Sequence, residues 1–177
     1  DVSGDTNHMP SSSAEMKPWR AFEEGHAVHQ FATMTFIRGG LIAIGITLLG
    51  GILAALYSMP SLAPSFQEIG LDLRQLRPIH TVFASAWVFL GGVAVVHRYL
   101  QDCGPPTLGD RWRLRVQVAS WAVAGVGILV TLSLGIGSGR EYVGFHPVLS
   151  LLILLGWLCF AWNFFRVAGP RFWERPA

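Results

Sequence analysis

The residue that most clearly could do chemistry is His80, because it lies inside a stretch that is long and apolar enough to cross a membrane. Between Arg77 and His97 the chain carries no formal charge, and ~20 apolar residues at a rise of ~1.5 Å each match the ~30 Å hydrocarbon core of a bilayer. His80 is therefore expected about one helical turn inside the membrane boundary. An unsatisfied polar group costs several kcal/mol there, so the imidazole needs a partner.

That partner could be a metal. At helical spacing from His80 the chain has Ala84, Trp87 and Gly91, so small side chains and one aromatic ring share its face of the helix. This face could accept a flat, apolar macrocycle whose iron binds His80, as imidazole does in haem proteins. The alternative is that His80 only forms a hydrogen bond with a neighbouring helix.

A second imidazole and two guanidinium groups lie close to the same membrane boundary. His146 precedes Pro147, which suits the first turn of a helix, and with His80 it could form a bis-imidazole site for haem b. Arg77 and Arg140 flank the same edge, where they could neutralise haem propionates. The alternatives are that His146 caps its helix or lies at the interface, and that both arginines face water.

Three further histidines carry weaker signals. His26 and His29 lie three residues apart and could grip a metal, but no third ligand stands at a suitable offset, so a solvated interfacial pair is favoured. His97 is followed by Arg98 and Tyr99, a cluster typical of the membrane interface, and we expect it to be a boundary residue in contact with water.

The sequence does not favour catalysis by this chain alone. It has no nucleophile beside a base, no paired carboxylates within the membrane and no phosphate-binding loop before a helix. Two cysteines are too few for a disulfide framework, and neither belongs to a Cys-x-x-Cys-His motif for covalent haem attachment. We therefore expect no enzymatic activity without partners.

The elements that must position these residues are membrane helices. Of the 177 residues, 51% are hydrophobic and only 14% are charged, which is too apolar for an ordinary soluble domain. Runs without charge cover residues 39–67, 78–96, 116–139 and 142–165, and each is long enough to span. The predicted fold class is an all-α, integral membrane four-helix bundle. We expect a polar segment with a short interfacial helix at 1–33, the four spans at 34–169 and a tail at 170–177.

Basic residues predict the orientation of these spans. Ten lie in the N-terminal segment, the connection between the second and third spans, and the C-terminal tail, whereas the other two loops hold only Arg74, Arg77 and Arg140. The positive-inside rule then places both termini in the cytoplasm and His80 on the outer side. We expect this membrane to be the inner membrane of a bacterium. The basic residues are not clustered with interleaved aromatics, so nucleic-acid binding has no support.

Two short motifs carry a resemblance to a known family. Residues 76–81 (LRPIHT) and residues 138–142 (SGREY) resemble the N-terminal part of haem-copper oxidase subunit I, in particular that of the cbb-type cytochrome oxidases and nitric oxide reductases. The resemblance extends roughly over residues 35–165. It implies that His80 is an axial ligand of a low-spin haem on the outer side of the membrane, and that Arg77 lies near the haem propionates.

The chain also departs from that family. The other metal ligands of subunit I lie beyond the stretch that this chain resembles, so we expect no dioxygen or nitric oxide chemistry in this polypeptide alone. Gly144 stands where related enzymes have an acidic residue that resembles a calcium ligand, so we expect no calcium site. His146 has no evident family counterpart.

Three functions follow as expectations. The chain is a non-catalytic scaffold or accessory subunit of a respiratory or photosynthetic electron-transfer complex, a haem b-binding electron relay ligated by His80, or the N-terminal piece of a split oxidase. All three imply other membrane protein subunits and lipids as partners. A cofactor other than haem b is not expected.

Overall fold

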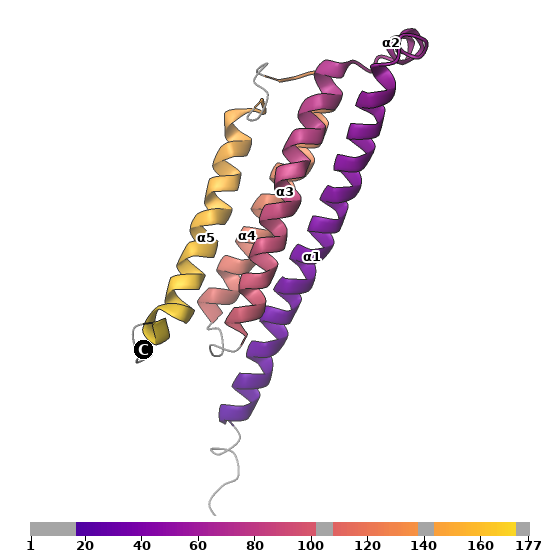
Figure 1. Cartoon of the computed structure of the whole chain (residues 1–177). Helices are drawn as coiled ribbons and strands as arrows, with labels where there is room; N and C mark the ends of the chain where they lie inside the picture. Colours follow the sequence, from indigo (N-terminus) through magenta and orange to yellow (C-terminus); the bar gives the residue numbers. More distant parts are fainter. Residues whose placement is uncertain (1–16, 102–107, 138–143, 173–177) are drawn as a thin grey trace, which may run out of the picture.

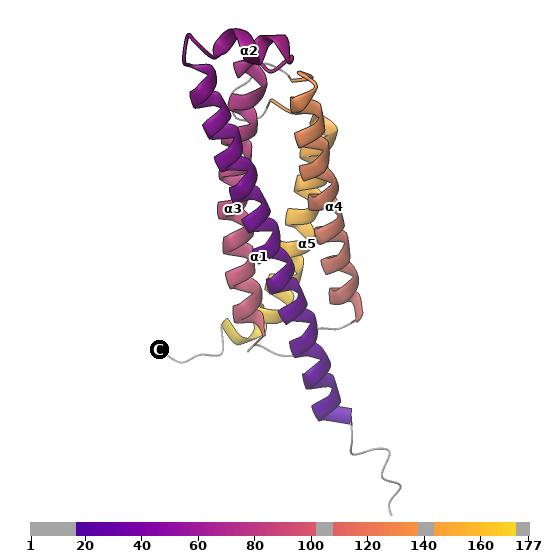
Figure 2. The same ribbon diagram turned by 90° about the vertical axis from the view of Figure 1, so that its right-hand side faces the viewer.

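The computed structural model describes residues 17–101, 108–137 and 144–172, and every regular element in these ranges is a helix. Four long helices lie side by side, and a short fifth one, α2, crosses one end of them (Figures 1 and 2). The elements in chain order are α1 (Lys17–Tyr57), α2 (Ala63–Glu68), α3 (Leu73–Leu100), α4 (Leu108–Ser133) and α5 (Pro147–Phe172). The predicted all-helical class is confirmed.

All four long helices contain a segment long and apolar enough to cross a membrane. These segments are Ala27–Tyr57, Leu73–Leu100, Asp110–Ser133 and Pro147–Gly169. Their outward faces carry many large exposed hydrophobic side chains, among them Leu41, Val95, Val126 and Leu158. Since soluble proteins rarely expose such surface over all their helices, these faces indicate a multi-pass membrane protein.

The N-terminal part of the chain differs from the expectation. The predicted short interfacial helix is not a separate element, because it continues directly into the first span as α1, a helix of 41 residues. The helix also runs across the expected boundary between residues 33 and 34. No proline occurs between Pro18 and Pro60, so nothing interrupts the helical hydrogen bonds. At ~1.5 Å per residue α1 is about 60 Å long, well over the thickness of the hydrocarbon core.

The loop between α1 and α3 brings the chain back at the same end. A proline in the first turn starts α2, and Gly70, with a φ of 75°, provides the left-handed residue after it. Asp72 then caps α3: its Oδ1 accepts from the backbone N–H of Arg74, while the Gln75 side chain accepts from the N–H of Asp72. This capping box fixes where α3 begins and therefore the depth of His80.

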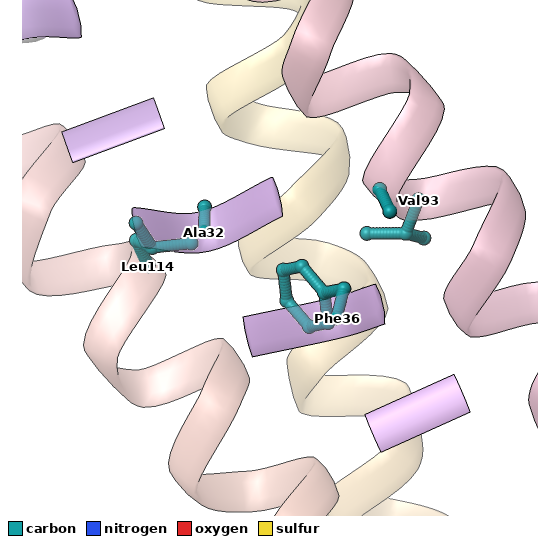
Figure 3. Packing of buried hydrophobic residues seen from close by; sticks show 5 residues of the cluster. Ala32, Phe36, Val93 and Leu114 are labelled. Atoms are coloured by element: carbon teal, nitrogen blue, oxygen red, sulfur yellow. The ribbon is translucent and has the colours of Figure 1, made fainter. Parts of the chain in front are cut away.

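Two hydrophobic clusters hold the long helices together. One consists of Ala32, Phe36, Val93, Ala94 and Leu114, and the other of Ala43, Ile79, Phe83, Ile128 and Leu132. Figure 3 shows the first cluster, in which Phe36 of α1 lies between Leu114 of α4 and Val93 of α3. The closest helix pairings are α1 with α3 and α4 with α5, and α3 joins the two pairs.

Candidate functional site

His80 is half-buried in the second turn of α3, and its ring is directed at α1. Its Nδ1 lies 2.8 Å from the backbone oxygen of Thr47. A carbonyl oxygen can only accept, so Nδ1 carries the proton and donates it to Thr47. The lone pair of the neutral imidazole is then on Nε2, and the bond at Nδ1 is the hydrogen bond that the structure gives this ring among the described residues. Metal-binding histidines typically have this arrangement, with one nitrogen held by a carbonyl and the other left for the metal.

Two adjacent glycines of α1 allow the His80 ring to lie there. A Cβ atom added at Gly51 would be 2.8 Å from Nδ1 and 2.9 Å from Cε1 of His80. A Cβ added at Gly50 would be 3.5 Å from the His80 backbone nitrogen. The glycine-rich pattern of this span predicts close packing against another helix, and the structure identifies the start of α3 as the segment that approaches.

The face of α3 that continues from His80 is partly open. Ala84 and Gly91 are half-buried, and Trp87 is 41% exposed. A Cβ added at Gly91 would meet no atom within 4 Å. In the described part of the chain this face is therefore only partly covered, although α1 passes close to it at Trp87, where a Cβ added at Gly40 would be 3.7 Å from the backbone oxygen.

His146 acts as a helix cap. It is exposed, and its Nδ1 accepts a hydrogen bond from the backbone N–H of Val148 in the first turn of α5, at 3.3 Å. An accepting Nδ1 places the proton of the neutral ring on Nε2, so neither nitrogen offers a free lone pair to a metal in this arrangement. No hydrogen bond joins His80 to His146, since their Nδ1 atoms pair with Thr47 and Val148, and the axial pair stays a prediction.

Of the two arginines predicted to lie near haem propionates, the structure describes only one. Arg77 is exposed, less than one turn before His80 in α3, and Arg140 lies outside the described residues. The same end is held by Gln75, whose side-chain amide donates to the backbone oxygen of Ser133 in α4 at 3.1 Å. This contact fixes the start of α3 relative to the end of α4.

The opposite end of the helices contradicts the expectation for His97. Only 1% of this residue is exposed, so it is a core residue and not a boundary residue in water. The Phe36 ring stacks on its imidazole with centroids 5.3 Å apart, and the centroids of His97 and His29 are 5.9 Å apart. The reason is that α1 continues beyond the apolar run and covers this part of α3. The spacing of Val93, His97 and Leu100 on one helical face could have revealed it.

A buried ion cluster joins α4 to α5 at this same end, and sequence reasoning missed it. Asp110 is 4% exposed, and its Oδ1 lies 2.6 Å from Arg113 Nη2 and 3.2 Å from Arg166 Nη1. Asn163 completes the cluster, because its Oδ1 accepts from Arg113 Nε at 2.8 Å and its Nδ2 donates to the Asp110 backbone oxygen. Two features of the sequence could have predicted it: Asp110 stands next to several arginines, and Asn163 is an amide within an apolar helix.

The described residues contain no group of three or more histidine, cysteine, aspartate or glutamate side chains that could hold a metal ion. A metal at His80 would therefore need a ligand frame of its own, such as a porphyrin, or ligands from outside these residues. No family model matches the chain, and neither a curated protein nor a solved structure matches it.

Proposed function

We propose that the chain is a non-catalytic, membrane-embedded part of a larger electron-transfer complex, and that His80 binds the iron of a haem b through Nε2. The observation that carries the proposal is the hydrogen bond from His80 Nδ1 to the Thr47 oxygen. It fixes the tautomer and the orientation of the ring, and it leaves the nitrogen that a haem iron takes. The resemblance of residues 76–81 to oxidase subunit I supports the same role.

The residues around His80 each contribute to such a site. Gly51 lets the ring lie against α1, and Ala84 and Gly91 are small and only half-buried, as a flat group beside α3 would require. Arg77 is exposed at the same end, where its guanidinium can pair with a propionate. A bound haem would supply one-electron transfer. Since Nδ1 of His146 is used by its helix cap, a second ligand to the iron would come from a partner subunit.

The proposed location is the inner membrane of a bacterium, with both termini in the cytoplasm and His80 near the periplasmic surface. The excess of basic residues at the other end of the helices supports this orientation. The partners are membrane protein subunits of the complex, together with lipids.

The test is a reduced-minus-oxidised visible spectrum of the chain in its isolated complex. We expect the α band of a b-type haem, its loss in His80→Ala and its retention in His146→Ala, the control that removes an exposed imidazole. A b-type band that survives in His80→Ala would refute the ligand assignment.

A second candidate is a scaffold subunit without a cofactor. It is favoured by the same hydrogen bond, because the Thr47 oxygen alone satisfies one nitrogen of the His80 ring and links α1 to α3. In that case the complex shows no b-type band, and His80→Ala weakens helix packing or assembly instead.

A further inference from the structure

We infer that His29 and His97 form a separate site, which binds a monovalent copper ion inside the end of the helices opposite α2. The two imidazoles come from different helices, α1 and α3, and both are buried, at 4% and 1% exposure. This inference does not depend on the haem proposal, because the two sites share no residue.

The distance between the rings decides which ion fits. With metal–nitrogen bonds of about 2 Å, two imidazoles on one ion have ring centres about 6 Å apart when the ligands are in line, and about 5 Å apart in a tetrahedral arrangement. The observed separation of the ring centroids is 5.9 Å, with the ring planes 37° apart, and this distance is compatible with both rings binding one ion in line. Monovalent copper accepts two nitrogen ligands in line, whereas zinc demands four ligands in a tetrahedron.

The surroundings of the pair favour an ion of low charge and low coordination number. Phe36 stacks on the His97 ring at an interplanar angle of 12°, and Phe160 meets it edge-on, with centroids 5.8 Å apart. No third histidine, cysteine or carboxylate of the described residues joins the pair. A divalent ion would remain under-coordinated among these aromatic rings, while a monovalent ion needs only the two imidazoles.

Several buried polar side chains at this end of the helices have no hydrogen-bond partner among the described residues. Neither ring nitrogen of His97 has a hydrogen-bond partner among the described residues. The same holds for the side-chain amide of Gln117 and the hydroxyl of Thr33. Gln117 lies on the face of α4 that turns towards Phe36, because Trp121, four residues on, contacts that ring. A metal-binding imidazole needs an acceptor for its other N–H, and these oxygens can provide one.

The experiment measures copper binding by the full chain in detergent micelles. Both cysteines are replaced by serine throughout, because thiolates are the strongest competitors for monovalent copper. The affinity is read by competition with bicinchoninate. We expect one tightly bound copper per chain and a loss of affinity of at least about 100-fold in His97→Phe and His29→Phe. The matched control, His146→Ala, is expected to change the affinity less than threefold, or about 0.65 kcal/mol (RT ≈ 0.59 kcal/mol times ln 3).

Phenylalanine preserves an aromatic ring against Phe36, and circular dichroism checks that each variant is helical. X-ray absorption of the copper-loaded chain should show two nitrogen ligands. Unchanged binding in His97→Phe, copper that depends on His146, or tighter binding of zinc than of copper at this pair would each overturn the inference.

Discussion

The substitution Gly51→Ala tests most directly whether close packing of α1 positions His80. The new Cβ would stand 2.8 Å from Nδ1 and 2.9 Å from Cε1 of the imidazole, well inside ordinary van der Waals contact. The ring has to move away, and it cannot do so while it keeps its 2.8 Å hydrogen bond to the Thr47 oxygen. We therefore expect Gly51→Ala to separate the two helices locally and to release Nδ1.

The cost follows from three contributions. Overpacking of a close contact costs about 1–3 kcal/mol, and loss of the hydrogen bond costs about 0.5–1.5 kcal/mol. Alanine is the better helix former by about 0.5–1 kcal/mol, which acts in the opposite direction. The net expectation is that the free energy of unfolding of Gly51→Ala falls by about 0.5–4 kcal/mol.

The assay is reversible unfolding of the purified chain in mixed detergent micelles, followed by helical circular dichroism. The control is Gly45→Ala in the same helix, where an added Cβ meets no atom within 4 Å, so its stability should stay equal or rise by up to about 1 kcal/mol. In the isolated complex Gly51→Ala should also shift or weaken the b-type band. If Gly51→Ala is as stable as Gly45→Ala, the reasoning about His80 is wrong.

Two further predictions concern α4 and α5. Gly156→Ala should lower the free energy of unfolding by about 1–3 kcal/mol, because the Trp121 indole, which donates to the Ile153 oxygen, occupies the place of the new Cβ. The control is Gly169→Ala, where an added Cβ meets no atom within 4 Å. Equal stability of the two variants would contradict the packing of Trp121 against Gly156. Asp110→Ala should cost about 1–3 kcal/mol, because it leaves two guanidinium groups side by side without their carboxylate. Arg166→Ala should cost at most about 1 kcal/mol, since 45% of that side chain is exposed. If Asp110→Ala destabilises the chain less than Arg166→Ala does, Asp110 is not the centre of the ion cluster.

Much of the helical architecture was predictable because membrane spans are defined by local composition. Charge-free runs of sufficient length predict four spans wherever they occur, and the structure has a membrane-length helix at each one. Pro147 at the start of the fourth span likewise marks the beginning of α5. These features depend on neighbours in sequence, so no knowledge of the tertiary contacts was needed.

The sequence also singled out His80 and the small residues near it, because a lone imidazole in an apolar run stands out. It left open whether that ring faces a helix or a cofactor. Only the packing of α1 against α3 assigns Nδ1 to the Thr47 oxygen and leaves Nε2 available.

Contacts between distant segments decided the rest. His97 reads as an interfacial residue because Arg98 and Tyr99 follow it, yet α1 covers it and brings His29 and Phe36 against it. Composition alone determined that this chain is built from membrane-length helices, since the cost of burying charge in lipid acts on each segment separately. The tertiary structure decided which imidazoles are enclosed, because burial depends on which helix lies alongside. The pairing of helices depends in turn on complementary shapes, such as Gly51 of α1 against the ring of His80.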